Sequence, residues 1–354
     1  MHLKRIAGLC LLLLILSLSA QAHRSPELGL RYVAADSVVV WGEGYSDLRG
    51  MALGVDTALR ETATLLPYSK RLQKDWLKHV VPQLALSGCR GGNDPIQTAV
   101  TDLAKAKTLF AATGQAQFMD AAERLLFNVL LREVVASGPG SFDKHTAAQA
   151  LVDGTGCIYA TDGDGLWINL FINSTTHVKT ADFSLVVDQM TDMPFSGRVK
   201  VRLTGMPRNG FPLKVRLRMP GWATGQLVPA GKYTYLSTPP VAPTVYINGR
   251  EGLNTAVDGG YVIVSRAWNR GDEILIDFPL SPCLVSHTVD GGSRTDIVRG
   301  PLFYTVADSC AQDNASIAGP LSETRDAADL PLVTGRYADG RVFTAWPYFL
   351  SGSE

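Results

Sequence analysis

Acidic residues and a histidine stand at two places where their spacing could support acid–base chemistry. Asp162 and Asp164 form one pair, and Asp143 precedes His145 in the other. Two carboxyl groups can cleave a glycosidic bond when one is protonated, and a carboxylate-held histidine can transfer protons near neutral pH. The Asp-Gly-Asp-Gly setting of Asp162 also suits a tight turn, because Asp accepts backbone hydrogen bonds and Gly tolerates positive φ. We favour a turn for the first pair and a loop for the second.

Tryptophan side chains could bind sugars, because an aromatic ring can stack on a sugar ring. Trp222 and Trp268 each stand at the end of a predicted strand beside a turn, and we name both as candidate sugar contacts. The alternative is that each ring fills the core and leaves only one edge near water. The alternating residues Lys214, Arg216 and Arg218 are predicted to form the solvated face of a strand.

The N-terminus has the features of an export signal. Lys4 and Arg5 precede an apolar run, and Ala20-Gln21-Ala22 offers small residues for cleavage. Residues 1–22 are therefore predicted to be a signal peptide cleaved near Ala22, which makes the mature chain secreted or periplasmic, without a membrane span. The 33 basic residues balance the 33 acidic ones, so no overall field favours nucleic acid. Four cysteines could pair in an oxidising compartment, with three connectivities open: Cys89, Cys157, Cys283 and Cys310.

Helices and strands must position these residues. In the first half of the chain, apolar residues recur at the spacing of a helix. Asp94-Pro95-Ile96-Gln97 combines a capping acid with a first-turn proline, which predicts a helix that ends at Thr113-Gly114. A second helix begins near Ala116, so the two form a helical hairpin. Earlier helices are predicted from Asp47 to about Leu66 and around residues 76–80.

The second half has a period of two, which predicts short antiparallel strands. Asn248-Gly249 is a strong hairpin turn. Residues 311–330 lack this pattern and are predicted to be a loop. The strands are predicted at 198–203, 213–219, 244–247, 261–264, 273–278, 301–306 and 341–349.

One segment, Cys157–Ser174, marks the change between the two halves. Its residues from Leu166 to Asn173 alternate, which predicts a continuous, half-buried strand after a turn. The sequence therefore indicates an α+β multidomain fold. An α-helical module over 23–155 precedes an antiparallel β-sandwich region over 156–354, which forms either one sandwich or two with a boundary near 285–300.

The order of several motifs resembles the glycoside hydrolase family typified by β-L-arabinofuranosidase (family 127-like). Each motif alone is weak, but their succession over the second half is specific. After Cys157–Ser174 come Met193–Val199, Leu217–Ala223, Val245–Gly249, Gly260–Val262, Arg266–Asp272, Val298–Tyr304 and Trp346–Phe349. The resemblance implies that the helical module is part of an (α/α)-barrel and that the partner is a plant-type glycan.

The same resemblance implies a zinc-held cysteine nucleophile, further zinc ligands and a glutamate acid/base. Zinc keeps a thiolate deprotonated, which suits it for attack. In this chain the triplet Ser87-Gly88-Cys89 retains one cysteine of the zinc site but not its glutamate. The adjacent cysteine pair falls near Phe142-Asp143, where neither cysteine is present, and no glutamate matches the acid/base. Cys89 is thus the one candidate zinc ligand, the alternative being a free or disulfide-bonded thiol.

Residues 23–155 have room for about four helices, too few to close a barrel of six helical hairpins. We therefore expect a β-L-arabinofuranosidase-type protein that does not run the family mechanism, and no catalytic residue is assigned. The alternative is a non-catalytic carbohydrate-binding or scaffold β-sandwich protein. A homodimer, in which a partner chain completes the barrel, is a further expectation.

Overall fold

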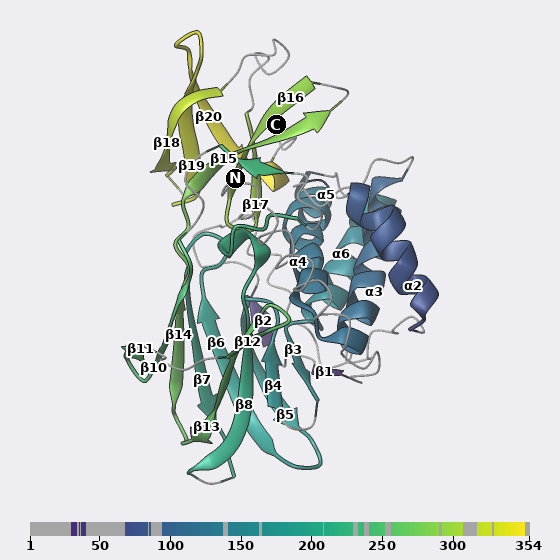
Figure 1. The fold of residues 1–354 in the computed structure, drawn as a ribbon, viewed down its shortest axis with the longest axis vertical. Coiled ribbons are helices and arrows are strands. Elements are labelled where there is room, and N and C mark those ends of the chain that lie inside the picture. The colour runs from purple at the N-terminus through teal and green to yellow at the C-terminus, as the bar shows by residue number, and fades with distance from the viewer. Residues whose placement is uncertain are drawn as a thin grey trace, which may run out of the picture.

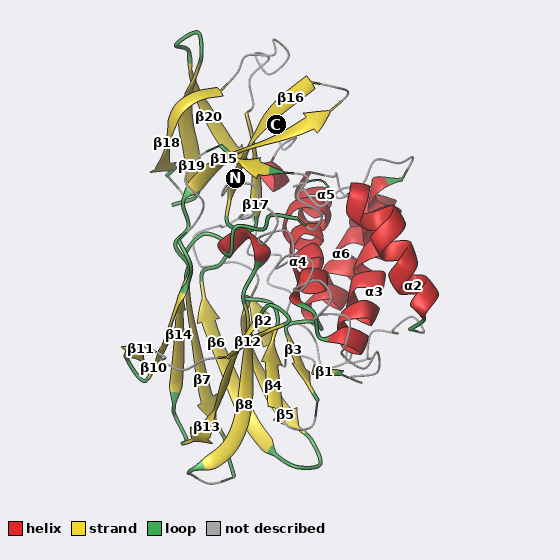
Figure 2. Cartoon of the chain, in the orientation of Figure 1, coloured by secondary structure: helices red, strands yellow, loops and turns green. Residues whose placement is uncertain are grey.

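The computed structural model describes residues 30–33, 35, 37–39, 68–83, 85, 94–136, 141–162, 165–207, 209–228, 233–236, 241–251, 256–289, 292–306, 317–327 and 329–350. The predicted signal peptide, the predicted helix at 47–66, Cys89 and Cys310 lie outside these ranges. Within them, helices occupy one side of the molecule and strands form the rest (Figure 2). No helix in the described ranges is long and apolar enough to cross a membrane.

The helical module contains both predicted helices of the hairpin. Helix α3 (Pro95–Thr113) begins where Asp94 Oδ1 accepts a hydrogen bond from the Gln97 amide at 2.9 Å, and it ends at Gly114, whose φ of 64° few other residues tolerate. The second helix continues without interruption through α4, η6 and α5, with a π-helical stretch in the middle. The helical segments are α2 (Lys70–Asp75), η4 (Trp76–Val80), η5 (Val81–Gln83), α3, α4 (Ala116–Arg124), η6 (Leu125–Leu130), α5 (Leu131–Ala136) and α6 (Phe142–Thr155).

Helix α6 corrects the loop predicted around Asp143 and His145. Both residues lie in its first turn, and the Ser141 hydroxyl accepts a hydrogen bond from the Lys144 amide at 3.3 Å. The neighbouring Gly-Pro-Gly residues suggested a loop, but a serine N-cap and two alanines facing the other helices are enough to start a helix here. Ala147 and Ala150 are buried.

The strands form three sheets, and the first two pack face to face below the third (Figure 1). The first sheet has the order β1-β3-β4-β8-β13-β12, and the second has the order β11-β10-β14-β7-β6-β5-β2. Alternate residues of β7 and β8 fill the space between the two sheets. The strands of these sheets are β1 (Arg31–Val33), β2 (Ser37–Val39), β3 (Tyr159–Thr161), β4 (Gly165–Ile168), β5 (Asn173–Lys179), β6 (Ser184–Thr191), β7 (Arg198–Thr204), β8 (Phe211–Arg218), β10 (Thr244–Ile247), β11 (Arg250–Glu251), β12 (Ala256–Asp258), β13 (Tyr261–Trp268) and β14 (Glu273–Asp277).

Most strand predictions are confirmed, but the prediction of one continuous strand in the segment Cys157–Ser174 is wrong. Strand β4 belongs to the first sheet and pairs in parallel with β8, whereas β5 belongs to the second sheet. Residues 169–172 lie between them, where the chain crosses from one sheet to the other. The prediction of a half-buried strand fails for the same reason, since both sets of alternating side chains from Leu166 to Ile172 are buried.

The third sheet has the order β18-β19-β20-β17-β16-β15-β9, and β18 folds over to contact β15. Strand β18 lies within the segment predicted to be a loop, so that prediction is wrong. The strands are β9 (Thr234–Tyr235), β15 (Pro282–Val289), β16 (Gly292–Arg299), β17 (Leu302–Val306), β18 (Ile317–Arg325), β19 (Pro331–Tyr337) and β20 (Val342–Pro347), with short 3-10 turns η7 (Gly221–Ala223) and η9 (Tyr348–Leu350) nearby.

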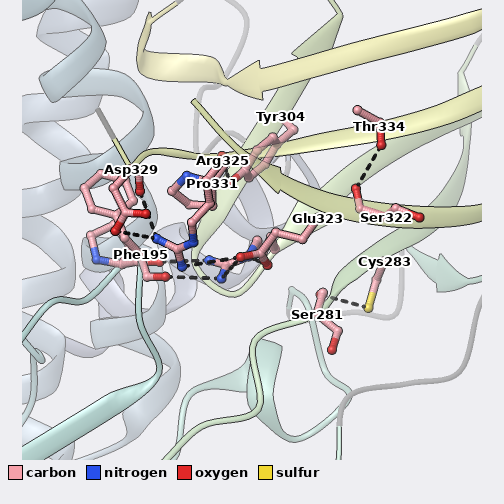
Figure 3. A network of polar contacts seen from close by, with 12 residues as sticks. Phe195, Ser281, Cys283, Tyr304, Ser322, Glu323, Arg325, Asp329, Pro331 and Thr334 are labelled. Carbon is pink, nitrogen blue, oxygen red and sulfur yellow. Dashed lines mark hydrogen bonds and ion pairs between the residues drawn. The ribbon is translucent and has the colours of Figure 1, made fainter. Parts of the chain in front are cut away.

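A buried arginine joins this third sheet to the second. Arg299 of β16 donates from Nε to Glu323 Oε2 at 2.7 Å and from Nη2 to the carbonyl of Phe195 at 3.1 Å. Phe195 lies in the β6–β7 connection, and Figure 3 shows it together with Glu323. The Pro194 carbonyl accepts a further hydrogen bond from Nη1 at 3.4 Å. The arginine side chain is 4% exposed and Glu323 27%, so the pair is largely shielded from solvent.

We predict that Arg299→Met lowers the free energy of unfolding by about 2–4 kcal/mol, because Glu323 and the two carbonyls lose their buried partner. Urea denaturation measures the change. Lys200→Met is the matched control, because Lys200 is 45% exposed and pairs with Glu273 at 3.6 Å; it should cost less than about 1 kcal/mol. Equal losses in the two variants would contradict the role of Arg299.

Candidate functional site at the helix–sandwich junction

Two carboxylates of the helical module meet one arginine of the first sheet. Asp120 and Glu123 are three residues apart on α4, so their side chains share one helix face. Arg218 at the end of β8 forms ion pairs with both, from Nη1 to Asp120 and from Nη2 to Glu123. The side chains of Arg218 and Glu123 are 0% and 1% exposed, and that of Asp120 is 17% exposed.

The remaining carboxylate oxygens also have donors. Trp222 Nε1 donates to Glu123 Oε2 at 2.8 Å, and the Gly221 amide donates to Asp120 Oδ2 at 3.2 Å. Gly221 fits because a Cβ there would stand 2.2 Å from the Gln226 carbonyl oxygen. Burial raises the pKa of Asp120 although Arg218 opposes it, whereas the pKa of Arg218 is raised by Glu123 and Asp120 against the effect of burial. All four carboxylate oxygens therefore have donors within the protein, and both carboxylates hold the helix against the sheet.

Asn169 supports this cluster from the crossover between the first two sheets. Its carbonyl accepts a hydrogen bond from Arg218 Nε, and its Oδ1 atom accepts one from the Tyr261 hydroxyl at 2.9 Å. Its Nδ2 atom donates to the Cys157 carbonyl at 3.0 Å. Asn169, at which the predicted strand is interrupted, thus provides a hydrogen-bond acceptor for the buried Arg218. Sequence reasoning gave no role to Asp120, Glu123 or Asn169, and the only local signal was the pair of acids on a helix face.

The predicted solvated face of β8 is wrong, because two of its three cations are shielded from solvent. Arg218 is buried as described, and Arg216 Nη1 lies 3.2 Å from Asp162 Oδ2 with both side chains about nine-tenths shielded, at 11% and 12% exposure. Asp162 also accepts a hydrogen bond from Trp167 Nε1 at 3.1 Å, and the Arg216 guanidinium lies 4.6 Å from the Trp167 ring centroid. Asp164, the other candidate acid, lies outside the described residues.

Both candidate sugar-contacting tryptophans lie in the core. Trp222 is 3% exposed and its ring lies 5.4 Å from that of Phe278. Trp268 is 0% exposed, and its Nε1 atom donates to the Leu213 carbonyl at 2.9 Å. These positions favour the core role that the sequence left open, and the role in sugar contact stays a prediction.

The described residues do not include a complete donor set for the zinc that the resemblance implies. The slot for the cysteine pair lies at the exposed start of α6, where Phe142 is 79% exposed. No three His, Cys, Asp or Glu side chains come together as a metal site in the described ranges. Cys157 is a buried thiol, and burial raises its pKa from the ordinary value to about 11, so it is no thiolate at neutral pH. Cys89 lies outside the described residues, and its role stays a prediction.

Comparison with known proteins agrees with the motif order in the second half. The family model described as "Beta-L-arabinofuranosidase, GH127 middle domain" matches residues 165–280. A solved GH127 β-arabinofuranosidase shares the fold with a TM-score of 0.63 at 20% identity, covering 76% of this chain and 52% of its own. A GH127 β-L-arabinofuranosidase from Geobacillus stearothermophilus T6 gives a TM-score of 0.58 at 16% identity, with coverages of 77% and 53%. No curated protein matches the sequence.

A third structure, titled glycoside hydrolase, gives a TM-score of 0.58 at 17% identity, with coverages of 73% and 50%. The chain thus spans about half the length of the structures that it matches. These structures share with this chain a fold in which a helical module packs on the strands. The GH127-like resemblance predicted from its motifs is confirmed by the family-model match over residues 165–280 and by this similarity of fold.

We predict that Arg218→Met lowers the free energy of unfolding by about 3–5 kcal/mol, because it leaves two buried carboxylates without their cation. The triple variant Arg218→Met, Asp120→Asn, Glu123→Gln removes the charges together and should recover part of the loss. Urea denaturation compares them with Arg202→Met, an exposed arginine 3.7 Å from Glu273, which should change little. A triple variant no more stable than Arg218→Met would contradict the explanation by unpaired charge.

We also predict that Cys157 resists alkylation in the folded protein. A pKa of about 11 lowers the thiolate fraction at pH 8 about a hundredfold relative to an ordinary thiol, and burial blocks access as well. Because the folded-state pKa is raised, the stability from this group is present below pH 9 and is lost as the pH rises towards 11. Peptide mass spectrometry after iodoacetamide treatment, with and without urea, measures the labelling; equal rates would contradict the prediction.

Proposed function

We propose that this chain is a glycoside hydrolase-like protein of the β-L-arabinofuranosidase type that acts on or binds plant-type glycans. The observation that carries the proposal is the GH127 middle-domain match over residues 165–280, folded as a sandwich with a helical hairpin packed on it. The solved proteins of similar fold include two titled as arabinofuranosidases, which supports the same class of substrate.

We further infer that the chain's own residues do not perform hydrolysis through a zinc-held cysteine. Serine stands where the family has the glutamate ligand, at position 87, and Phe142 and Asp143 stand where it has two cysteines. The carboxylates that the hairpin brings to the sheet, Asp120 and Glu123, are saturated by Arg218, Trp222 and Gly221. Each of the four carboxylate oxygens thus already has a donor within the protein, so neither group has an oxygen free for a leaving group.

The organisation that we propose follows the resemblance. Residues 1–22 direct export to the periplasm or the exterior, 23–155 form a remnant of an (α/α)-barrel, and 156–354 form the β-sandwich region. Residual zinc binding would involve Cys89. A second copy of the chain could complete the barrel, and molar mass in solution would detect such a homodimer.

We predict that the purified full chain binds arabinose-containing plant oligosaccharides on a glycan array but releases no arabinose from an aryl β-L-arabinofuranoside, with or without added zinc. Binding without turnover supports the alternative, a non-catalytic carbohydrate-binding or scaffold β-sandwich protein. Retaining hydrolysis that a zinc chelator abolishes would overturn the inference about mechanism. Absence of both binding and hydrolysis across the array would overturn the proposed function itself.

A further inference from the structure

We propose that Tyr233, His287, Arg294 and Asp296 form a saccharide-binding subsite on one face of the third sheet. The inference rests on the proposed function and deepens it, because it names where a neutral sugar would bind. None of these residues belongs to the helix–sandwich junction, and none was singled out by the sequence motifs.

The register of three neighbouring strands brings the four residues together. His287 of β15 stands opposite Arg294 of β16, and Asp296 lies two residues further along β16, so it points to the same face. Thr234 of β9 pairs with Ser286, which places Tyr233 beside His287 across the next strand pair. Diagonal and direct neighbours on one sheet face are within reach of each other's side chains.

The imidazole of His287 lies against a carboxylate. Its Nδ1 atom is 2.9 Å from Asp296 Oδ2, and the two side chains are 12% and 21% exposed. This is a close ion-pair contact rather than a hydrogen bond, because the buried Nδ1 atom has no hydrogen-bond partner among the described residues. Each imidazole nitrogen can therefore offer a donor or an acceptor to a ligand. Neither Nε2 nor Asp296 Oδ1 has a hydrogen-bond partner among the described residues.

An aromatic ring fixes the imidazole from a second direction. The ring centroids of Tyr233 and His287 are 4.8 Å apart with an interplanar angle of 48°, a tilted contact. Such a contact restricts rotation of His287 about its side-chain bonds, so less of the imidazole's motion has to be lost when a ligand binds. Preorganisation of this kind increases affinity because less conformational entropy is lost on binding.

The chemistry of the four residues suits a ligand rich in hydroxyl groups. The exposed Arg294 offers donors, and His287 and Asp296 offer acceptors, within one patch of strand surface. A sugar hydroxyl can donate and accept at once, so it matches both. One cation and one anion make the patch nearly neutral, which disfavours a polyanion, and a histidine and one carboxylate are too few for a described metal site.

The test measures binding of neutral arabino-oligosaccharides to the full chain by calorimetry. His287→Ala and Asp296→Asn should each weaken binding about tenfold, as expected for the loss of one or two oriented hydrogen bonds. The matched control is His145→Ala, an exposed histidine in the first turn of α6, which should keep the wild-type affinity. Unfolding curves establish that each variant is folded.

A second measurement needs no variant. The ring resonances of His287 in the wild-type protein should shift on titration with the oligosaccharide, whereas those of His145 should not. Wild-type binding with unchanged affinity in both variants, or with unshifted His287 resonances, overturns this subsite alone. No binding by the wild-type chain overturns the proposed function and the subsite with it.

Discussion

A buried arginine between two carboxylates sets the arrangement of the molecule. Removing a guanidinium and two carboxylates from water costs several kcal/mol per ion, and this cost is offset only when every donor and acceptor finds a partner. Arg218 meets this condition through Asp120, Glu123 and the Asn169 carbonyl, and the carboxylates are completed by Trp222 and Gly221. Helix α4, the end of β8, the crossover at residues 169–172 and the turn η7 must therefore all be in place together.

Two further polar contacts extend this arrangement to the third sheet. Asn128, fully buried in η6, donates to the Pro301 carbonyl at 3.0 Å and accepts from the Phe303 amide at 2.9 Å. Arg299 then ties the same sheet to the β6–β7 connection (Figure 3). Apolar burial supplies most of the stability of such junctions, but it is not directional. Buried hydrogen bonds with fixed geometry specify how the helical module and the three sheets are oriented.

This arrangement also decides which acids are available for chemistry. The carboxylates nearest the sheet are used to hold Arg218, and Asp162 is used to hold Arg216 and Trp167. His287 and Asp296 on the β15–β16 strands take no part in this junction and lie 2.9 Å apart. A fold similar to that of solved arabinofuranosidases is thus combined with a junction that is structural, and the subsite that we propose lies on the third sheet, apart from it.

The sequence by itself determined the elements whose signals are local. Asp94 and Gly114 bound α3 as predicted, and Asn248 and Gly249 adopt the positive φ values of 50° and 76° that a tight hairpin requires. Alternation predicted most strands, because one strand's period depends only on its own residues. The start of α6 was missed since its capping serine follows Gly-Pro-Gly, and β18 was missed since it is an exposed edge strand with little alternation.

Only the tertiary structure decided which surfaces are covered. Arg216 and Arg218 alternate with apolar residues as solvated residues do. Nothing within β8 reveals that Arg218 pairs with carboxylates of a helix nearly 100 positions earlier; Arg218 and Asp120 are separated by 98 residues. Within the strand pattern Asn169 is an ordinary alternating position; in the structure it lies at the sheet crossover, where Arg218 and Tyr261 bind it. Burial and pairing of charges are non-local, so the period of a single segment cannot encode them.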